Sequence, residues 1–323
     1  MIITVQDFTG VYAEQAFMQE LRATAETSKD VRWLNCTKIV GTDCYCDDDA
    51  IKEINELIDN AESNSKSECD SIIENRDNSA NDIAPQPSIH FFDNGNYHYM
   101  SKLWTDRIQD PFSLIVFDHH PDMQPPRFGG ILSCGGWVKE VLDNNKFVQN
   151  VIIIGVKDEL VETVREELSQ SGEANILEKV TFIKKSELNT LSFQSSLSSL
   201  TPSASGAAVR SYQQINLPLR HSPGSLLVSR LSSQHSLYIS IDKDALSPSY
   251  AVTNWDQGSL TLDALKNCIT ALTTNRKILG IDICGERAHD FEGDEHHTIQ
   301  EADTLNSELN RKLVEFLQKI KVS

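Results

Sequence analysis

The sequence of 323 residues contains no run of about 18 apolar residues, so no segment predicts a transmembrane helix. Residues 1–5 also lack the basic start and the long apolar stretch of a signal peptide. The seven cysteines are odd in number and lack the even spacing of a disulfide framework. We therefore expect a cytoplasmic protein with reduced thiols and no membrane partner.

Positive charge is scarce. The chain has 29 Lys and Arg against 47 Asp and Glu, and its net charge is −18. No basic stretch offsets the repulsion between this charge and phosphate groups, so nucleic acid and anionic membranes are not expected as partners. A small cationic substrate would be attracted, although an acidic surface also simply keeps a protein soluble.

A Cys-x-x-Cys pair is missing as well. Residues 44–46 read Cys-Tyr-Cys, which is one residue short of the spacing in zinc knuckles and thioredoxin-like sites, and no second thiol pair follows. We interpret Cys44 and Cys46 as structural, in preference to metal binding or redox use.

Apolar segments that predict strands alternate with amphipathic segments that predict helices. Strands are expected at 2–5, 113–117, 151–155, 180–183, 237–242 and 277–283, and helices at 13–27, 137–142, 158–168, 261–272 and 301–320, with another opening at Asp48. This alternation predicts an α/β fold in three layers, α/β/α, around a mainly parallel sheet. We expect one domain over residues 1–323, with a polar loop inserted at 61–88 and a long excursion at 188–235.

The apolar run 113–117 stops abruptly at Asp118, His119, His120 and Asp122. Chemistry in open α/β sheets gathers at the carboxyl ends of strands. If the chain stays extended, the residues at 118, 120 and 122 point to one side and His119 to the other. The carboxylates of Asp118 and Asp122 would repel each other, so a cation bound between them is the simplest explanation of this pattern. Oxygen and nitrogen ligands suit Mn, Zn, Fe or Ni better than Ca. The alternative is a capping aspartate followed by a surface histidine pair.

A second predicted strand ends in the same way. Residues 237–242 finish at Asp242, Asp244 follows two positions later, and Lys243 faces away. Together the two strand ends hold four carboxylates and a histidine, which is more negative charge than one divalent ion neutralises. The sequence therefore predicts two metal ions.

Residues 118–122, Asp-His-His-Pro-Asp, resemble the Asp-x-His-x-Asp signature of the arginase and agmatinase (ureohydrolase) family. Residues 240–248, Ser-Ile-Asp-Lys-Asp-Ala-Leu-Ser-Pro, resemble its Ser-x-Asp-x-Asp-x-x-x-Pro signature. The family's upstream histidine, usually in Gly-Gly-Asp-His, matches His98 in Asp-Asn-Gly-Asn-Tyr-His. The likeness covers about residues 90–290 and implies the arginase-like fold, with a homo-oligomer as a further implication.

The resemblance implies a centre of two divalent ions, with Mn²⁺ preferred, bridged by Asp118 and Asp242. The six implied ligands are His98, Asp118, His120, Asp122, Asp242 and Asp244. A hydroxide bridging the ions would break a C–N bond of a small cationic guanidino or amidino compound, releasing urea or a related product. Asp122 would help move the proton, and Glu286 would pair with the guanidinium.

Three departures from the family pattern bear on this interpretation. Cys134 stands nearest the position of the family's proton-shuttle histidine, and we interpret it as a packing residue. The residues that hold the amino acid end of arginine are not recognisable, and Arg127 in their place hints at a carboxylate-bearing substrate. Glu286 could equally start a helix or form a salt bridge.

Two alternatives stay open beside the dinuclear hydrolase. One is a single-zinc hydrolase of the deacetylase type, whose fold is similar and whose site also uses Asp and His. The other is a catalytically inactive arginase-fold binding protein, which the missing shuttle histidine motivates.

Overall fold

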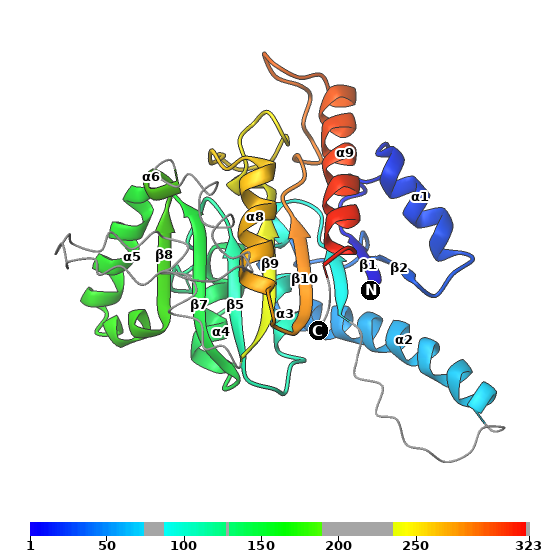
Figure 1. The fold of residues 1–323 in the computed structure, drawn as a ribbon, viewed down its shortest axis with the longest axis horizontal. Coiled ribbons are helices and arrows are strands. Elements are labelled where there is room, and N and C mark those ends of the chain that lie inside the picture. Colours follow the sequence, from blue (N-terminus) through cyan, green and yellow to red (C-terminus); the bar gives the residue numbers. More distant parts are fainter. Residues whose placement is uncertain (74–86, 127–128, 189–234, 321–323) are drawn as a thin grey trace, which may run out of the picture.

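The computed structural model describes residues 1–73, 87–126, 129–188 and 235–320 (Figure 1). Eight strands form one sheet in the order β2-β1-β4-β10-β9-β5-β7-β8, and every neighbouring pair is parallel. These strands are β1 (Ile2–Asp7), β2 (Val31–Asn35), β4 (Ser88–Phe91), β5 (Phe112–Phe117), β7 (Val148–Val156), β8 (Val180–Lys184), β9 (Ser236–Asp242) and β10 (Ile278–Cys284). A separate antiparallel pair joins β3 (Tyr45–Cys46) to β6 (Leu132–Ser133).

Helices cover both faces of the sheet. One core contains residues of α1 (Ala16–Ala25), α8 (Leu262–Thr273) and α9 (Ile299–Leu317). The other contains residues of α2 (Asp48–Ile73), α3 (Met100–Thr105), α4 (Trp137–Asn144) and α5 (Asp158–Gln170). The remaining short helices are α6 (Lys185–Leu188), η1 (Gly95–Tyr97), η2 (Cys134–Gly136), η3 (Ala174–Lys179) and η4 (Lys243–Ala245). The predicted three-layer α/β/α fold is confirmed.

Strand β5 shows why the central strands are apolar at every position. All six of its residues are buried. Ile115 and Phe117 belong to the core under α8 and α9, whereas Leu114 and Val116 belong to the opposite core. Because successive side chains point to opposite faces and helices cover both, neither face tolerates a charged residue.

Two expected boundaries are corrected. Helix α2 runs to Ile73, so the first part of the segment predicted as a polar loop, 61–88, is helical, and residues 74–86 lie outside the described structure. The helix expected at 261–272 begins at Leu262, because Thr261 is its capping residue and its side chain accepts a hydrogen bond from Ala264 N. The predicted excursion at 188–235 falls almost entirely outside the described residues. None of the described helices is long and apolar enough to cross a membrane.

The strand order positions the site. Strands β4, β10, β9 and β5 lie side by side in the sheet. Along the chain the order differs: β5 is the next strand of this sheet after β4, and β9 and β10 come more than a hundred residues later. In a parallel sheet their carboxyl ends meet at one edge. The segments carrying His98, Asp118, Asp242 and Cys284 all leave the sheet at that edge.

Candidate metal centre

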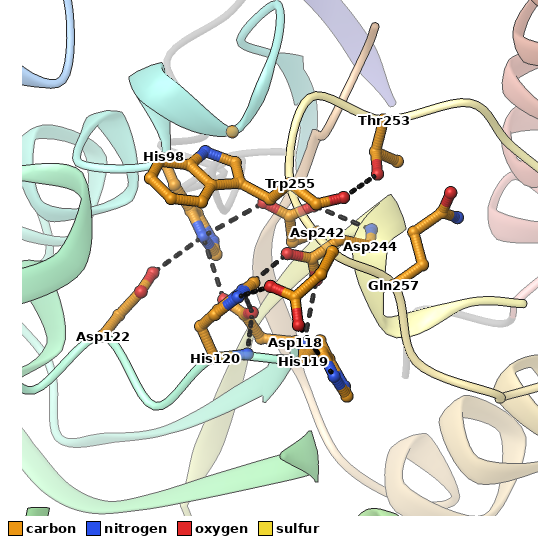
Figure 2. Close-up of polar contacts among 12 residues, drawn as sticks. His98, Asp118, His119, His120, Asp122, Asp242, Asp244, Thr253, Trp255 and Gln257 are labelled. Atoms are coloured by element: carbon orange, nitrogen blue, oxygen red, sulfur yellow. Dashed lines mark hydrogen bonds and ion pairs between the residues drawn. The ribbon is translucent and has the colours of Figure 1, made fainter. Parts of the chain in front are cut away.

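His98 lies among three carboxylates. Its Nδ1 is 3.2 Å from Asp118 Oδ2, 3.0 Å from Asp122 Oδ2 and 3.5 Å from Asp242 Oδ2 (Figure 2). On the other side of the ring, Nε2 is 2.8 Å from the hydroxyl of Ser240. This hydrogen bond orients the imidazole so that Nδ1 faces the carboxylates, which is how supporting residues orient histidine ligands in metal sites.

His120 makes a second, adjacent group. Its Nδ1 lies 2.8 Å from Asp244 Oδ2 and 3.5 Å from Asp118 Oδ1, and its Nε2 lies 2.8 Å from Asp256 Oδ1. Asp118 belongs to both groups, one oxygen in each, so the two groups share a carboxylate. The structure thus brings together all six ligands predicted from the sequence.

The backbone turns these side chains inward. Asp122 has φ of 49°, so the chain does not stay extended to this residue as the parity argument assumed. Its carboxylate accepts a hydrogen bond of 2.7 Å from Trp137 Nε1, which keeps it on the same side as Asp118. His119 faces away, with Nδ1 3.4 Å from Gly155 O, while its backbone N–H donates to Asp244 Oδ1 at 2.9 Å.

The four aspartates of the two groups are buried close together, which changes their pKa values. Burial and the charge of Asp118 raise the pKa of Asp122 to about 6, and burial and neighbouring aspartates raise the pKa values of Asp242 and Asp244. Burial opposes ionisation of Asp118 too, but the adjacent imidazoles hold its pKa below the ordinary range. Burial lowers the pKa of His120, yet its contacts with Asp118 and Asp244 outweigh this and raise the pKa to about 12. The raised pKa values of Asp122, Asp242 and Asp244 show that burial and mutual repulsion disfavour their charged forms, and the lowered pKa of Asp118 shows that positive charge nearby favours ionisation.

A cavity of about 480 Å³ opens onto these groups. No lysine or arginine is found among the described residues that line it, so His98 and His120 are the basic side chains of this lining that face the four aspartates. Oxygen and nitrogen ligands with a shared carboxylate suit two divalent cations of the first transition row. The donor set and its charge therefore fit divalent cations: His98, Asp118 and Asp122 form one candidate ligand group, and Asp118, His120 and Asp244 form the other.

Glu286 lies away from this cavity. Its carboxylate is fully buried and ion-paired with Lys243, and it also accepts hydrogen bonds from Gln15, Asn306 and Asn310. The structure thus shows the salt-bridge alternative for Glu286, and the contact between Glu286 and a guanidinium stays a prediction that this placement does not support. The preceding residue explains the direction: Gly285 has φ of +89°, and a Cβ there would lie 2.3 Å from Asp242 Oδ1.

The structure adds groups that the sequence did not indicate. Cys284 Sγ donates to Asp242 Oδ2 at 3.2 Å, and burial raises the pKa of this thiol, so it stays a donor. The strand register is what would have indicated this contact, because Cys284 on β10 pairs with Asp242 on β9. Trp255 forms part of the cavity lining near His120, with ring centroids 5.8 Å apart.

Trp255 is held by the loop before His98. Its Nε1 donates to Asn96 Oδ1 at 3.1 Å, and a Cβ on Gly95 would lie 2.6 Å from the indole. Cys134 lines the same cavity, in keeping with its place in the family pattern. Arg127, the predicted hint of a carboxylate-bearing substrate, lies outside the described residues.

No protein-family model matches the chain. It is 26% identical over 198 residues to an uncharacterised protein of Thermotoga maritima, which covers 61% of this chain and 58% of that protein. The chain thus matches less than two thirds of that relative's length.

Solved structures are similar in fold. Arginase from Bacillus caldovelox superposes with a TM-score of 0.54 at 12% identity, over 95% of this chain and 97% of that one. The agmatine ureohydrolase of Thermoplasma volcanium gives 0.53 at 12% identity, over 98% and 89%. The resemblance to the arginase and agmatinase family predicted from the motifs is confirmed for the fold.

Proposed function

We propose that this arginase-fold chain is a divergent ureohydrolase, a dinuclear metal-dependent hydrolase that cleaves a C–N bond of a small guanidino or amidino compound. The observation that carries the proposal is the convergence of two aspartate-bearing strand exits and His98 on two ligand groups that share Asp118. Manganese is the proposed ion, because carboxylate and imidazole ligands suit it.

Two bound ions would polarise the substrate and supply a nucleophile derived from water at neutral pH. The protein's own part is positional. Trp137 holds Asp122 at the cavity wall, where its carboxylate can accept a proton and return it to the leaving amine. Ser240 and Cys284 hold His98 and Asp242 in place from behind.

The lining favours a cationic substrate without a carboxylate. Glu167 adds a further acid to the four aspartates in the wall, and the described lining offers no lysine or arginine to pair with a carboxylate. Trp255, 43% exposed, presents an indole to the cavity, and such a face attracts a guanidinium by about 0.5–2 kcal/mol. Glu286 is not among the described residues that line the cavity. We therefore propose that Trp255 contacts the substrate cation in place of this glutamate.

Metal content tests the centre. After chelation and reloading with Mn²⁺, the wild-type protein should hold two ions per chain by elemental analysis. Asp118→Asn should lose affinity for both ions, because Asp118 is shared between the groups. His119→Asn is the matched control, because its side chain lies between two ligands in sequence but faces away. At most one ion in the wild-type protein would overturn the dinuclear proposal.

A substrate panel tests the reaction. We expect turnover of agmatine-like cations in the presence of Mn²⁺, with weaker or no turnover of arginine, guanidinobutyrate and formiminoglutamate, and no turnover of arginine-containing peptides. The burial of Glu286 against Lys243 favours a second candidate, a metal-loaded binding protein without catalysis. That protein would hold two ions and turn over no member of the panel.

A further inference from the structure

Cys44 and Cys134 flank the small antiparallel sheet, each one residue beyond the paired residues of β3 and β6. Tyr45 pairs with Ser133 and Cys46 with Leu132, so the next step outward places Cys44 against Cys134. Cys134 N donates to Cys44 O at 2.9 Å. In a regular antiparallel ladder, hydrogen-bonded residues have Cα atoms about 5.5 Å apart, inside the span of about 4.4–6.8 Å that a disulfide bridges; Cys44, with φ of 59°, lies just beyond the regular ladder.

The interaction between the two thiols lowers the pKa of Cys44 and raises that of Cys134, because a proton kept on one sulfur stabilises a thiolate on its neighbour. Both residues are half-buried and line the cavity, whereas Cys36, Cys46, Cys268 and Cys284 are buried. An attacking thiolate and a resolving thiol therefore stand side by side where small molecules enter.

We propose that Cys44 and Cys134 form a redox-active dithiol in the cavity wall, which closes to a disulfide by exchange with a low-molecular-weight disulfide such as oxidised glutathione. The Cys44 thiolate attacks one sulfur of the reagent, and the S–S bond breaks to release one thiolate. Cys134 then loses its proton and attacks Cys44 Sγ, releasing the second thiolate. The two protein thiols are oxidised by two electrons, and the reagent is reduced to two thiols.

This inference revises the structural interpretation of Cys44 and the packing interpretation of Cys134. It does not depend on the proposed hydrolase, since its chemistry involves thiols alone. The segment that carries Cys134 also contacts the candidate metal centre. Gly135 accepts a hydrogen bond from Gln124 N at 2.9 Å, and Trp137 in the same segment donates a hydrogen bond to Asp122. Closing the disulfide would tie this segment to β3.

The test is disulfide mapping on the full-length protein. The reduced protein is incubated with oxidised glutathione, free thiols are blocked by alkylation at low pH, and proteolytic peptides are identified by mass spectrometry. We expect a cross-linked pair of peptides that contain residues 44 and 134, fully reversed by dithiothreitol, with release of two equivalents of glutathione thiol.

Three variants assign the roles. Cys134→Ser should accumulate a stable mixed disulfide with glutathione on Cys44, because the resolving thiol is gone. Cys44→Ser should remain unmodified at Cys134. Cys46→Ala is the matched control, because Cys46 lies two residues from Cys44 but is buried; this variant should form the cross-link as the wild-type protein does. A stable mixed disulfide in the wild-type protein, a cross-link through any other cysteine, or no loss of thiols would overturn the proposal.

Discussion

Replacing Glu286 by glutamine separates a structural role from a substrate contact. The side chains of Lys243 and Glu286 are 0% and 1% exposed, and the carboxylate holds the ammonium group together with Asn310. Glutamine keeps the shape of the side chain but removes its charge, so the Lys243 ammonium stays buried without an ionic partner. Removing one partner of a buried ion pair costs about 3–5 kcal/mol of unfolding free energy.

This cost in unfolding free energy predicts the change in Tm. With an unfolding entropy of about 2.1 cal/mol/K per residue, a chain of 323 residues changes Tm by about 1.5 °C for 1 kcal/mol, so Glu286→Gln should lower Tm by roughly 4–7 °C. The double variant Lys243→Met/Glu286→Gln removes both charges and should regain part of the loss, because no charge is left buried alone. Glu308→Gln, which breaks an exposed pair with Lys312, is the control and should change stability by less than about 1 kcal/mol.

Thermal unfolding followed by circular dichroism, with metal content measured on the same samples, gives the result. We expect a lower Tm for Glu286→Gln and two ions per folded chain. A variant with wild-type Tm and a raised KM for a guanidino compound would refute this reasoning, because it would place Glu286 at the substrate.

Three further predictions concern the metal ligands. Gly285→Ala should destabilise the protein by roughly 1–3 kcal/mol and weaken metal binding, because the new Cβ would press on Asp242; an unchanged Tm with and without Mn²⁺ would contradict it. Ser240→Ala removes the hydrogen bond that orients His98 and should weaken metal affinity about 10–100-fold in a chelator competition, whereas equal affinity would show that the hydroxyl is dispensable. Chelation alone should lower Tm by leaving four carboxylates uncompensated, and Mn²⁺ should restore it; a Tm indifferent to metal would argue that no ion is bound.

The predictions from sequence succeeded where a local pattern has a direct physical cause. An apolar run such as 113–117 must be buried on both sides, which predicts a central strand. The acids that follow it stand where such a strand leaves the sheet, which places Asp118 and, by the same argument, Asp242 at one edge. Helix α9 was also predicted, and its capping box of Thr298 and Glu301 is readable from the sequence.

Sequence periodicity alone determined that this protein is a layered α/β chain with acidic strand exits, because burial and strand alternation act on residues close together in the chain. Only the tertiary structure decided which exits meet. The strand order sets β10 and β9 between β4 and β5, which brings Cys284 onto Asp242 and His98 onto both aspartates. The tertiary structure also decided that Glu286 faces Lys243 and that Cys44 lies against Cys134. Long-range pairing and the left-handed backbone of Gly285 leave no periodic trace in the sequence, so neither contact could be predicted from it.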